Sequence, residues 1–214
     1  MKLAQAIQEI KDKSKQRKFN QSVDLIINFR TVDFNKPDNR LKLELKLPKG
    51  RGKKKRVAVI TKTMVDAAKK AADVVITDAE LSDLGQDKKK VKQITSKIDF
   101  FLAEADPAIM GLVAKNLGQV LGPKGKMPKP VPPRSPIENI IKGLQETITI
   151  KNKGKFLPTV HTPVGTEDMP NQDLEENIRF VYSKVIASLP NQEGNIKSMF
   201  IKTTMGPVIK VEMK

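Results

Sequence analysis

Apolar and polar residues alternate along two stretches near the N-terminus. Every second residue is apolar within residues 23–29 and again within 41–47, and turn-forming residues at 35–39 separate the two stretches. A period of two is typical of strands that bury one face and leave the other wet, so the pattern predicts an antiparallel hairpin. Residues 2–17 instead carry apolar side chains at helical spacing, which predicts an amphipathic helix packed on that hairpin.

The middle of the chain has a different pattern, in which short continuous apolar runs alternate with helical stretches. This arrangement is typical of a parallel sheet covered by helices on both faces. The predicted strands are 57–60, 74–76 and 100–102, the predicted helices are 64–72, 79–97, 107–120 and 136–146, and a strand at 148–150 completes the unit.

The last third of the chain returns in part to alternation. A helix over about residues 171–189 has one apolar face, and it leads to two final strands at 199–203 and 208–213. These elements resemble the N-terminal ones more than the middle ones, so both ends of the chain are predicted to build one domain together.

The predicted architecture is therefore a discontinuous two-domain protein that combines α/β and α+β organisation. An antiparallel α+β domain contains residues 1–50 and 154–214, and a parallel-sheet α/β domain of residues 51–153 is inserted into it. Glycines and like charges in residues 48–56 predict a flexible linker, and two linkers side by side would form a hinge.

Composition adds a strong positive charge to this picture. The chain carries 40 Lys and Arg against 24 Asp and Glu, a formal charge of +16. Such an excess indicates a polyanionic partner, with nucleic acid ahead of an anionic membrane surface, and the binding should weaken steeply as salt rises. A heat-adapted surface is the plain alternative, but it predicts balanced signs.

The charge is not spread evenly along the chain. Residues 51–153 carry 21 basic and 11 acidic side chains, whereas residues 154–214 carry seven of each. Charge alone therefore favours the inserted domain as the nucleic-acid binder. Since charge reports affinity for phosphate in general and not the place of specific contacts, the choice between the two domains stays open at this point.

Several function classes lack the residues that they need. The chain has no cysteine, which excludes disulfides and thiolate metal sites, and no apolar run long enough to cross a bilayer or to act as a signal peptide, so a soluble cytoplasmic protein is expected. The single histidine, His161, has no clustered carboxylates near it in sequence, so it predicts neither a zinc site nor an acid–base pair. It contacts a partner or ends a strand, and no cofactor is expected.

Two glycine-containing motifs are candidates for contact with a phosphate backbone. Residues 118–134 combine glycines, prolines and basic side chains, which fits either a phosphate-contacting loop or a helix C-cap with a solvated connector. A nucleotide-binding P-loop is excluded there because Val120 and Met127 stand where it needs Gly and Ser or Thr. Residues 203–207, TTMGP, offer hydroxyls and close backbone approach, although a simple turn is favoured by composition. Phe19 is able to stack on one base.

The stretches LGPKGKMP at residues 121–128 and TTMGP at residues 203–207 resemble signature segments of the ribosomal protein L-one family, found on the mobile stalk beside the tRNA exit site. Lys18-Phe19 and residues 48–50 and 161–165 also look like family positions, so the resemblance covers nearly the whole chain. The short N-terminal segment and the basic residues 53–56 make it similar to archaeal members.

The resemblance implies that the domain built from both ends binds a structured large-subunit rRNA stalk element and that the insert is a Rossmann-like domain. It also implies contact with exit-site tRNA, assistance in releasing deacylated tRNA, repression of its own messenger RNA, and a monomer when free of the ribosome. The RNA-binding positions that it implies are Lys18, Phe19, Ser22, Lys151, Asn152, His161, Ser198, Thr204, Met205 and Gly206.

The rival hypothesis is an enzyme with a Rossmann-like domain that acts on a nucleotide or phosphorylated substrate. No Gly-x-Gly-x-x-Gly follows any predicted strand of the insert, and no nucleophile is paired with a base in the sequence. A doubly wound sheet carries many functions, so the fold by itself does not support an enzyme. The sequence therefore favours a ribosomal RNA-binding protein that is not an enzyme.

Overall fold

The computed structural model describes residues 1–133, 135–152 and 157–212. Arg134 of the basic motif, and Lys153 and Gly154 at the predicted return linker, lie outside these residues. The chain divides into two compact units: the first contains Met1–Lys53 and Glu146–Lys214, and the second contains Lys54–Gln145. Each unit has hydrophobic clusters of its own.

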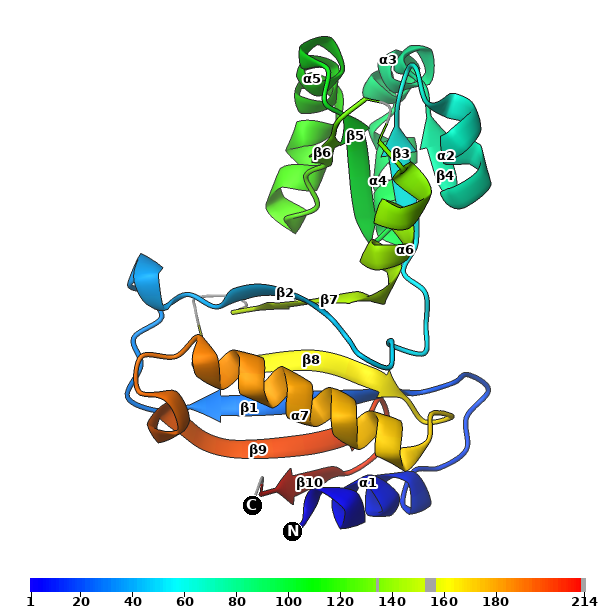
Figure 1. Ribbon diagram of the computed structural model, residues 1–214. Helices are drawn as coiled ribbons and strands as arrows, with labels where there is room; N and C mark the ends of the chain where they lie inside the picture. The colour runs from blue at the N-terminus through cyan, green and yellow to red at the C-terminus, as the bar shows by residue number, and fades with distance from the viewer. Residues whose placement is uncertain (134, 153–156, 213–214) are drawn as a thin grey trace. The chain divides into compact units, whose positions relative to one another are not determined.

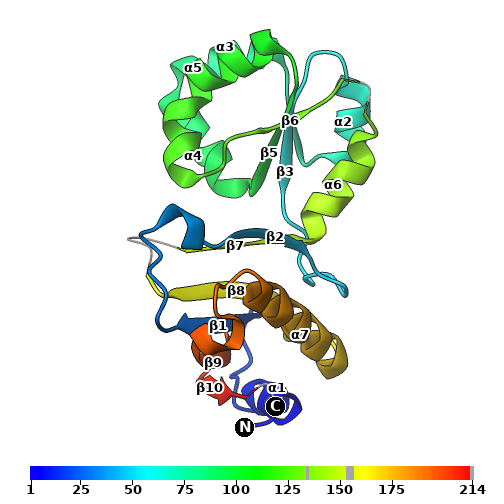
Figure 2. The same cartoon turned by 60° about the vertical axis from the view of Figure 1, so that its left-hand side comes forward.

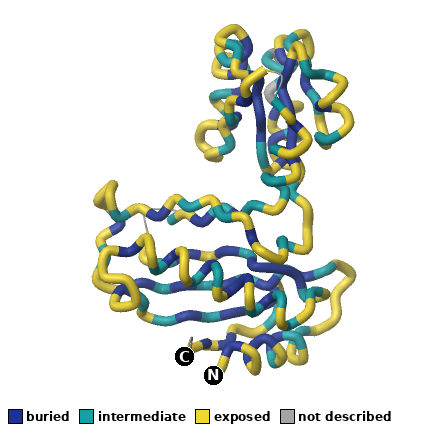
Figure 3. The backbone as a smooth tube through the Cα atoms, in the orientation of Figure 1, coloured by how far each residue is buried: buried dark blue, intermediate teal, exposed yellow. Residues whose placement is uncertain are grey.

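The first unit is built on an antiparallel four-stranded sheet with the order β10-β9-β1-β8 (Figure 1). Its strands are β1 (Ser22–Phe29), β8 (Thr159–Thr166), β9 (Ile196–Thr203) and β10 (Val208–Val211). The predicted alternation is confirmed in β1, where every second residue from Val23 to Phe29 is buried. Along β9, buried positions alternate with partly buried ones in the same way (Figure 3).

Two helices cover one face of this sheet. α1 (Leu3–Asp12) contacts β9 and β10, and α7 (Asn171–Ala187) contacts β8 and α1 (Figure 2). The buried faces of both helices and of the strands form a single core that contains Ile7, Leu25 and Ile178, all fully shielded from solvent. Burial of apolar area at roughly 25 cal/mol per Å² makes this contact the main source of stability for the unit. Two short 3-10 helices, η1 (Pro37–Asn39) and η2 (Gln192–Asn195), lie in its loops.

The predicted hairpin between residues 23–29 and 41–47 is wrong. β1 pairs with β8 along one edge and with β9 along the other, so it has no free edge for another strand. β2 (Lys42–Lys46) pairs instead with β7 (Thr147–Lys151) in a separate antiparallel ribbon. The predicted strand at 148–150 thus lies in the first unit rather than completing the inserted one, and the second unit ends at Gln145.

The segment predicted as a flexible linker is partly held on the first unit. The buried side chain of Asn177 accepts a hydrogen bond from the backbone N–H of Lys49 at 3.2 Å and donates to the carbonyl of Gly50 at 2.9 Å. A Cβ on Gly52 would lie 2.4 Å from Oγ1 of Thr166, so only glycine fits there. Lys53 donates from Nζ to the carbonyl of Asn20. Residues 49–53 are therefore part of the first unit's surface.

The second unit is the predicted parallel sheet, with the order β4-β3-β5-β6. One face packs on α3, α4 and α5 and the other on α2 and α6, which confirms helices on both faces. Its elements are β3 (Val57–Ile60), α2 (Val65–Ala71), β4 (Val74–Ile76), α3 (Asp78–Gln86), α4 (Lys88–Lys97), β5 (Phe100–Glu104), α5 (Pro107–Lys124), β6 (Lys129–Val131) and α6 (Ile137–Glu146).

Two predicted elements of this unit are corrected by the structure. The single helical stretch at 79–97 is two helices, because the side chain of Asp87 caps the start of α4 by accepting from the backbone N–H groups of Lys89 and Lys90. The basic loop at 118–134 is shorter than expected, since α5 continues to Lys124 and ends at Gly125 in the left-handed conformation. Residues Lys129–Val131 within it form an edge strand.

Lys126 of the same motif does not project outward as expected. Its Nζ donates to the carbonyls of Thr95 at 3.1 Å and Ile98 at 2.5 Å, at the C-terminus of α4. A cation at this position stabilises the negative end of the helix dipole and bonds carbonyls that have no partner within the helix. The helix C-cap interpretation of the motif is the one that the structure supports for this lysine.

A carboxylate fills the place where open parallel sheets usually bind ligands. Glu104 lies at the carboxyl end of β5, beside the end of β3, where the strand order reverses. Burial alone would raise the pKa of this carboxyl. The Thr63 hydroxyl, the backbone N–H groups of Lys62 and Thr63 and the Thr61 hydroxyl all donate to it, however, and together they lower its pKa to about 2.

Glu104→Gln is expected to destabilise the second unit by about 3 kcal/mol at neutral pH, which is the value of a pKa change from 4.5 to about 2. Because the folded pKa lies below the unfolded one, this stabilisation is complete above pH 4.5 and is lost as the pH falls toward 2. Denaturant unfolding followed by circular dichroism at a series of pH values will measure it. The acid-induced loss of stability should be smaller in the variant; equal pH profiles would contradict the argument.

Candidate nucleic-acid interface

The TTMGP motif forms the tight connection between β9 and β10. The backbone N–H of Gly206 donates to the carbonyl of Thr203 at 3.2 Å, so the segment is a turn, as composition favoured. A Cβ on Gly206 would lie 2.1 Å from Oγ1 of the buried Thr203, which explains the glycine sterically. The turn projects Met205, whose side chain is 61% exposed. A large apolar side chain held at an exposed turn is a candidate contact for a partner.

Thr204 joins this turn to the start of β1. Its Oγ1 accepts from the backbone N–H of Ser22 at 3.1 Å and donates to the carbonyl of Ser22 at 3.3 Å. The side chain therefore satisfies the backbone of β1 beyond the last pair of β1 with β9, while remaining exposed. Ser22 and Thr204 are 182 positions apart in sequence, so the structure brings together two of the predicted RNA-binding residues.

The turn is held in place by Gln21, a residue that the sequence did not single out. Its side chain is fully buried, and its Oε1 accepts from the backbone N–H of Met205 at 3.0 Å. Its Nε2 lies within hydrogen-bonding distance of Ser14 Oγ at 2.8 Å, Glu167 Oε2 at 3.1 Å and the Lys15 carbonyl at 3.2 Å. Gln21 thus connects the turn, the loop before β1 and the segment after β8. The sequence does contain a sign of this role: Gln21 lies two residues before Val23, so it continues the series of every second residue that faces the core of the unit.

Lys18 and Phe19 lie in the loop before β1, as predicted. Both residues are exposed, Phe19 to 49%. They line an open depression of about 480 Å³. Its other lining residues are Ser14, Gln16, Arg17, Asn20, Glu167 and Asp168. The basic residues of this loop face the solvent, whereas Glu167 accepts from the backbone N–H of Gln21 at 2.9 Å and is used inside the unit.

His161 and Ser198 lie on the sheet face opposite α1 and α7. His161 pairs with Ile26 across β8 and β1, and Ser198 pairs with Asn28 across β9 and β1. The amide of Asn28 donates to Oγ of Ser198 at 3.1 Å, which leaves the hydroxyl hydrogen of Ser198 for another acceptor. Ser22 belongs to the same face by strand alternation. This face, which we call the open face, therefore carries three predicted residues and adjoins the turn.

Lys151 and Asn152 are not brought to this cluster. Lys151 is the last residue of β7 in the two-stranded ribbon and Asn152 follows it, near the end of β1 that lies about 20 Å from Ser22 at the usual rise of a strand. The Asn152 side chain accepts from the backbone N–H of Leu41 at 2.9 Å and donates to the carbonyl of Leu157 at 3.2 Å. These bonds give Asn152 a structural task at the ribbon's end, separate from the turn.

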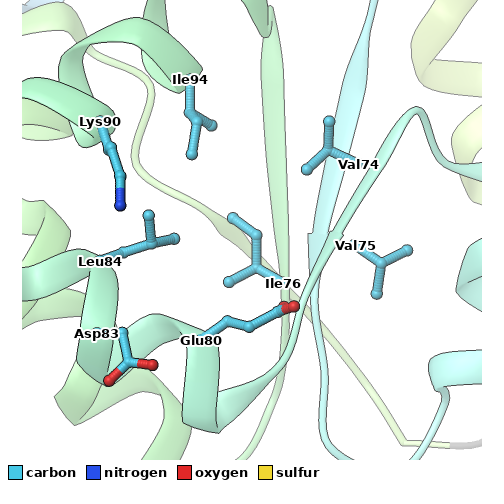
Figure 4. A pocket seen from close by; sticks show the side chains of 8 residues that line it. All are labelled: Val74, Val75, Ile76, Glu80, Asp83, Leu84, Lys90 and Ile94. Atoms are coloured by element: carbon cyan, nitrogen blue, oxygen red, sulfur yellow. The ribbon is translucent and has the colours of Figure 1, made fainter.

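A surface pocket in the second unit is the alternative candidate for a ligand site. It measures about 330 Å³ and lies between β4, α3 and α4. Val74, Ile76, Leu84 and Ile94 line its apolar part, while Val75 points away from it (Figure 4). The charged residues at its rim are Glu80, Asp83 and Lys90. The two carboxylates at the rim would repel a phosphate group. Glu104 occupies the crevice in which such sheets usually bind ligands, so this unit offers no support for a nucleotide-dependent enzyme.

Neither a cluster of metal ligands nor a membrane-spanning helix is found in the part of the chain that the structure describes. Among those residues, no group of three or more His, Asp or Glu side chains is placed to hold a metal ion. No helix there combines the length and the apolar character that a bilayer crossing requires. The fold and the surface together define a basic two-unit protein that pairs a doubly wound insert with an antiparallel domain exposing a mainly polar sheet face.

Comparison with known proteins gives the family directly. Residues 10–207 match the ribosomal protein L1p/L10e family, and the chain belongs to that family. It is 43% identical over 211 residues to the large ribosomal subunit protein uL1 of Methanothermobacter thermautotrophicus, covering 98% of each chain. The uL1 protein of Pyrococcus abyssi is 42% identical over 213 residues, which is 99% of this chain and 95% of the relative. The uL1 protein of Thermococcus kodakarensis is 43% identical over 213 residues, with 99% and 97% covered.

The family membership confirms the predicted resemblance, including its similarity to archaeal members. It makes the chain a ribosomal protein and not an enzyme, so the rival hypothesis of a nucleotide-dependent enzyme is set aside. The two-unit organisation of a parallel and an antiparallel sheet agrees with the predicted fold class.

Proposed function

We propose that this chain is a structural constituent of the large ribosomal subunit that binds a structured element of the subunit's RNA through its discontinuous unit. The observation that carries the proposal is the exposed Thr204–Gly206 turn, which buried Gln21 fixes against Ser22. Family membership supports a ribosomal site, which is cytoplasmic, and the excess of basic over acidic residues supports an RNA partner.

Most of the residues proposed to contact RNA lie around the turn and on the open face, and two of them, Lys151 and Asn152, lie apart from this group. Hydroxyls of Ser22, Ser198 and Thr204 suit 2′-hydroxyls and phosphates of a shallow RNA groove, which is recognised chiefly by shape. Lys18 supplies charge, Phe19 a ring for stacking, Met205 a soft apolar contact, and His161 a polar edge on the open face. Gly206 contributes through the turn itself. Lys151 and Asn152 remain proposed contacts of a second, separate point on the RNA.

We further infer that the protein assists the release of deacylated tRNA from the exit site and represses translation of its own messenger. An rRNA-like site on that messenger would bind to the same turn and open face, so the two RNAs would compete. The inserted unit, which carries much of the positive charge, is the proposed surface toward tRNA. The free protein is proposed to be a monomer.

Filter binding of the purified protein to a stalk fragment of large-subunit RNA, over a salt series, is expected to give specific and salt-dependent binding. About four neutralised phosphates would lower the affinity about 100-fold between roughly 0.05 and 0.2 M monovalent salt. An arbitrary hairpin of equal length is the control, and it should bind at least about 100-fold more weakly. Equal affinity for both RNAs would reject specific recognition.

A further inference from the structure

Two hydrophobic side chains lie at the centre of the open face. Ile26 of β1 is directly opposite Phe200 of β9. On the far side of Ile26 stands His161 of β8, and on the far side of Phe200 stands Lys210 of β10. One row of side chains, which we call the central row, therefore crosses all four strands in the order Lys210, Phe200, Ile26, His161.

The apolar members of this row are not core residues. Ile26 and Phe200 are only partly buried, and neither belongs to the cluster that packs beneath α1 and α7. The other outward positions of β1 are Ser22, Asp24 and Asn28, so Ile26 departs from the polar pattern of its own strand. A cross-strand pair of this kind stabilises a sheet by about 0.2–1 kcal/mol, which is one reason for its presence. An apolar patch rimmed by polar groups is also typical of a binding surface.

The rows on either side carry little net charge. In one, Asn28 pairs with Ser198, and their side chains share a hydrogen bond of 3.1 Å. In the other, Lys202 lies directly opposite Asp24, so opposite charges are adjacent, and the apolar side chains of Val208 and Pro163 stand at the two ends of that row. The open face thus differs from a phosphate-binding surface, in which cations predominate.

We propose that the central row contacts the uncharged parts of the bound RNA, namely riboses and base edges in a shallow groove, with the Phe200 ring against a sugar or base. The inference rests on the proposed function, because it extends the turn and Ser22 along the same face. The row's two apolar side chains, Ile26 and Phe200, add affinity through van der Waals packing and exclusion of water, without neutralising phosphate. The row lies between Thr204 at one end of β1 and Ser198 toward the other, so it joins them into one surface.

The chemistry of the row favours RNA over a protein partner. Lysine, serine and aspartate are depleted in the centres of protein–protein interfaces, yet they surround Ile26 and Phe200 here. The apolar area is small: Ile26 and Phe200 form its centre, and Val208 and Pro163 stand only at the ends of a neighbouring row. Such a small hydrophobic centre between hydroxyl, amide and imidazole groups matches the alternation of apolar and polar edges along an RNA groove.

The test uses the full chain with Ile26→Thr and Phe200→Thr combined, since threonine is well tolerated in strands. The double variant is expected to bind the stalk fragment about tenfold more weakly, with an unchanged slope of log affinity against log salt and unchanged binding of the arbitrary hairpin. Lys18→Gln should instead reduce the slope by about one. Val74→Thr is the matched control, because Val74 is an exposed strand residue of the second unit.

Thermal unfolding by circular dichroism will establish that the double variant is folded. Unchanged affinity for the fragment, or a change in salt slope equal to that of Lys18→Gln, would overturn the inference. A wild-type dimer in sedimentation that the double variant abolishes would also overturn it, by assigning the row to a second copy of the chain. If the wild-type protein does not bind the fragment more tightly than the hairpin, the proposed function itself fails. If the wild-type protein is specific for the fragment but the double variant binds it with the same affinity, this inference alone fails.

Discussion

Met205→Asp is expected to lower the affinity for the stalk RNA fragment at least about 100-fold while leaving the fold intact. The side chain is 61% exposed, so the substitution costs the folded state less than about 0.5 kcal/mol. At the proposed interface it removes an apolar contact and places a carboxylate against a polyanion, where like charges brought together cost several kcal/mol. Filter binding and thermal unfolding on the same preparation will measure both effects.

Met127→Asp is the matched control for this prediction. Met127 is 45% exposed and lies in the second unit, and the substitution changes the net charge by the same amount. Replacing residues 54–145 by a short Gly–Ser linker should likewise leave fragment binding largely intact, since the proposed contacts lie in the first unit. Equal losses in both point variants, or loss of binding on removal of the insert, would assign recognition to the more basic second unit.

Gln21→Leu is expected to destabilise the first unit by about 2–4 kcal/mol and to abolish specific RNA binding. Leucine is close in size but leaves the backbone N–H of Met205 and the Oε2 atom of Glu167 without the side-chain partner that they have in the folded chain. Each buried polar group left unpaired costs about 1–3 kcal/mol, and the turn that carries Thr204 loses its support. Denaturant unfolding and filter binding below the transition will separate the two effects.

The control for Gln21→Leu is Gln172→Leu, the same change at an exposed position of α7. It should alter stability by less than about 0.5 kcal/mol and leave RNA binding unchanged. If Gln21→Leu binds the fragment as wild type does, Gln21 has no part in positioning the turn. That outcome would leave the proposed contacts of Thr204 and Met205 in place but would remove the account of how they are held.

The elements that could be predicted from the sequence are those fixed by local periodicity. The inward series from Val23 to Phe29 gave β1 correctly, and the apolar runs of the middle segment gave a parallel sheet. The partner of β1 could not be predicted in this way. Pairing depends on which other strands can reach the two edges of β1. Both strands that pair with it, β8 and β9, come from the last third of the chain.

The candidate site shows the same division. Exposed Phe19, Thr204 and Met205 were identified by motif, and the structure places them around the start of β1. Gln21 was missed because a polar residue beside a strand reads as a loop residue until its burial is known. Lys126 was misassigned for the opposite reason: a lysine between glycine and proline reads as exposed, and only the tertiary fold shows the α4 carbonyls that it binds.

Strand β1 is synthesised early, within the first thirty residues, yet both of its neighbours are made much later. Its edges therefore have no native partners until Thr166 and then Thr203 have emerged, and loop closure over such separations is slow. The surface that joins Ser22 to Thr204 consequently exists only in an almost finished polypeptide. A nascent or truncated molecule would lack it, so RNA recognition would serve as a mark of completed synthesis.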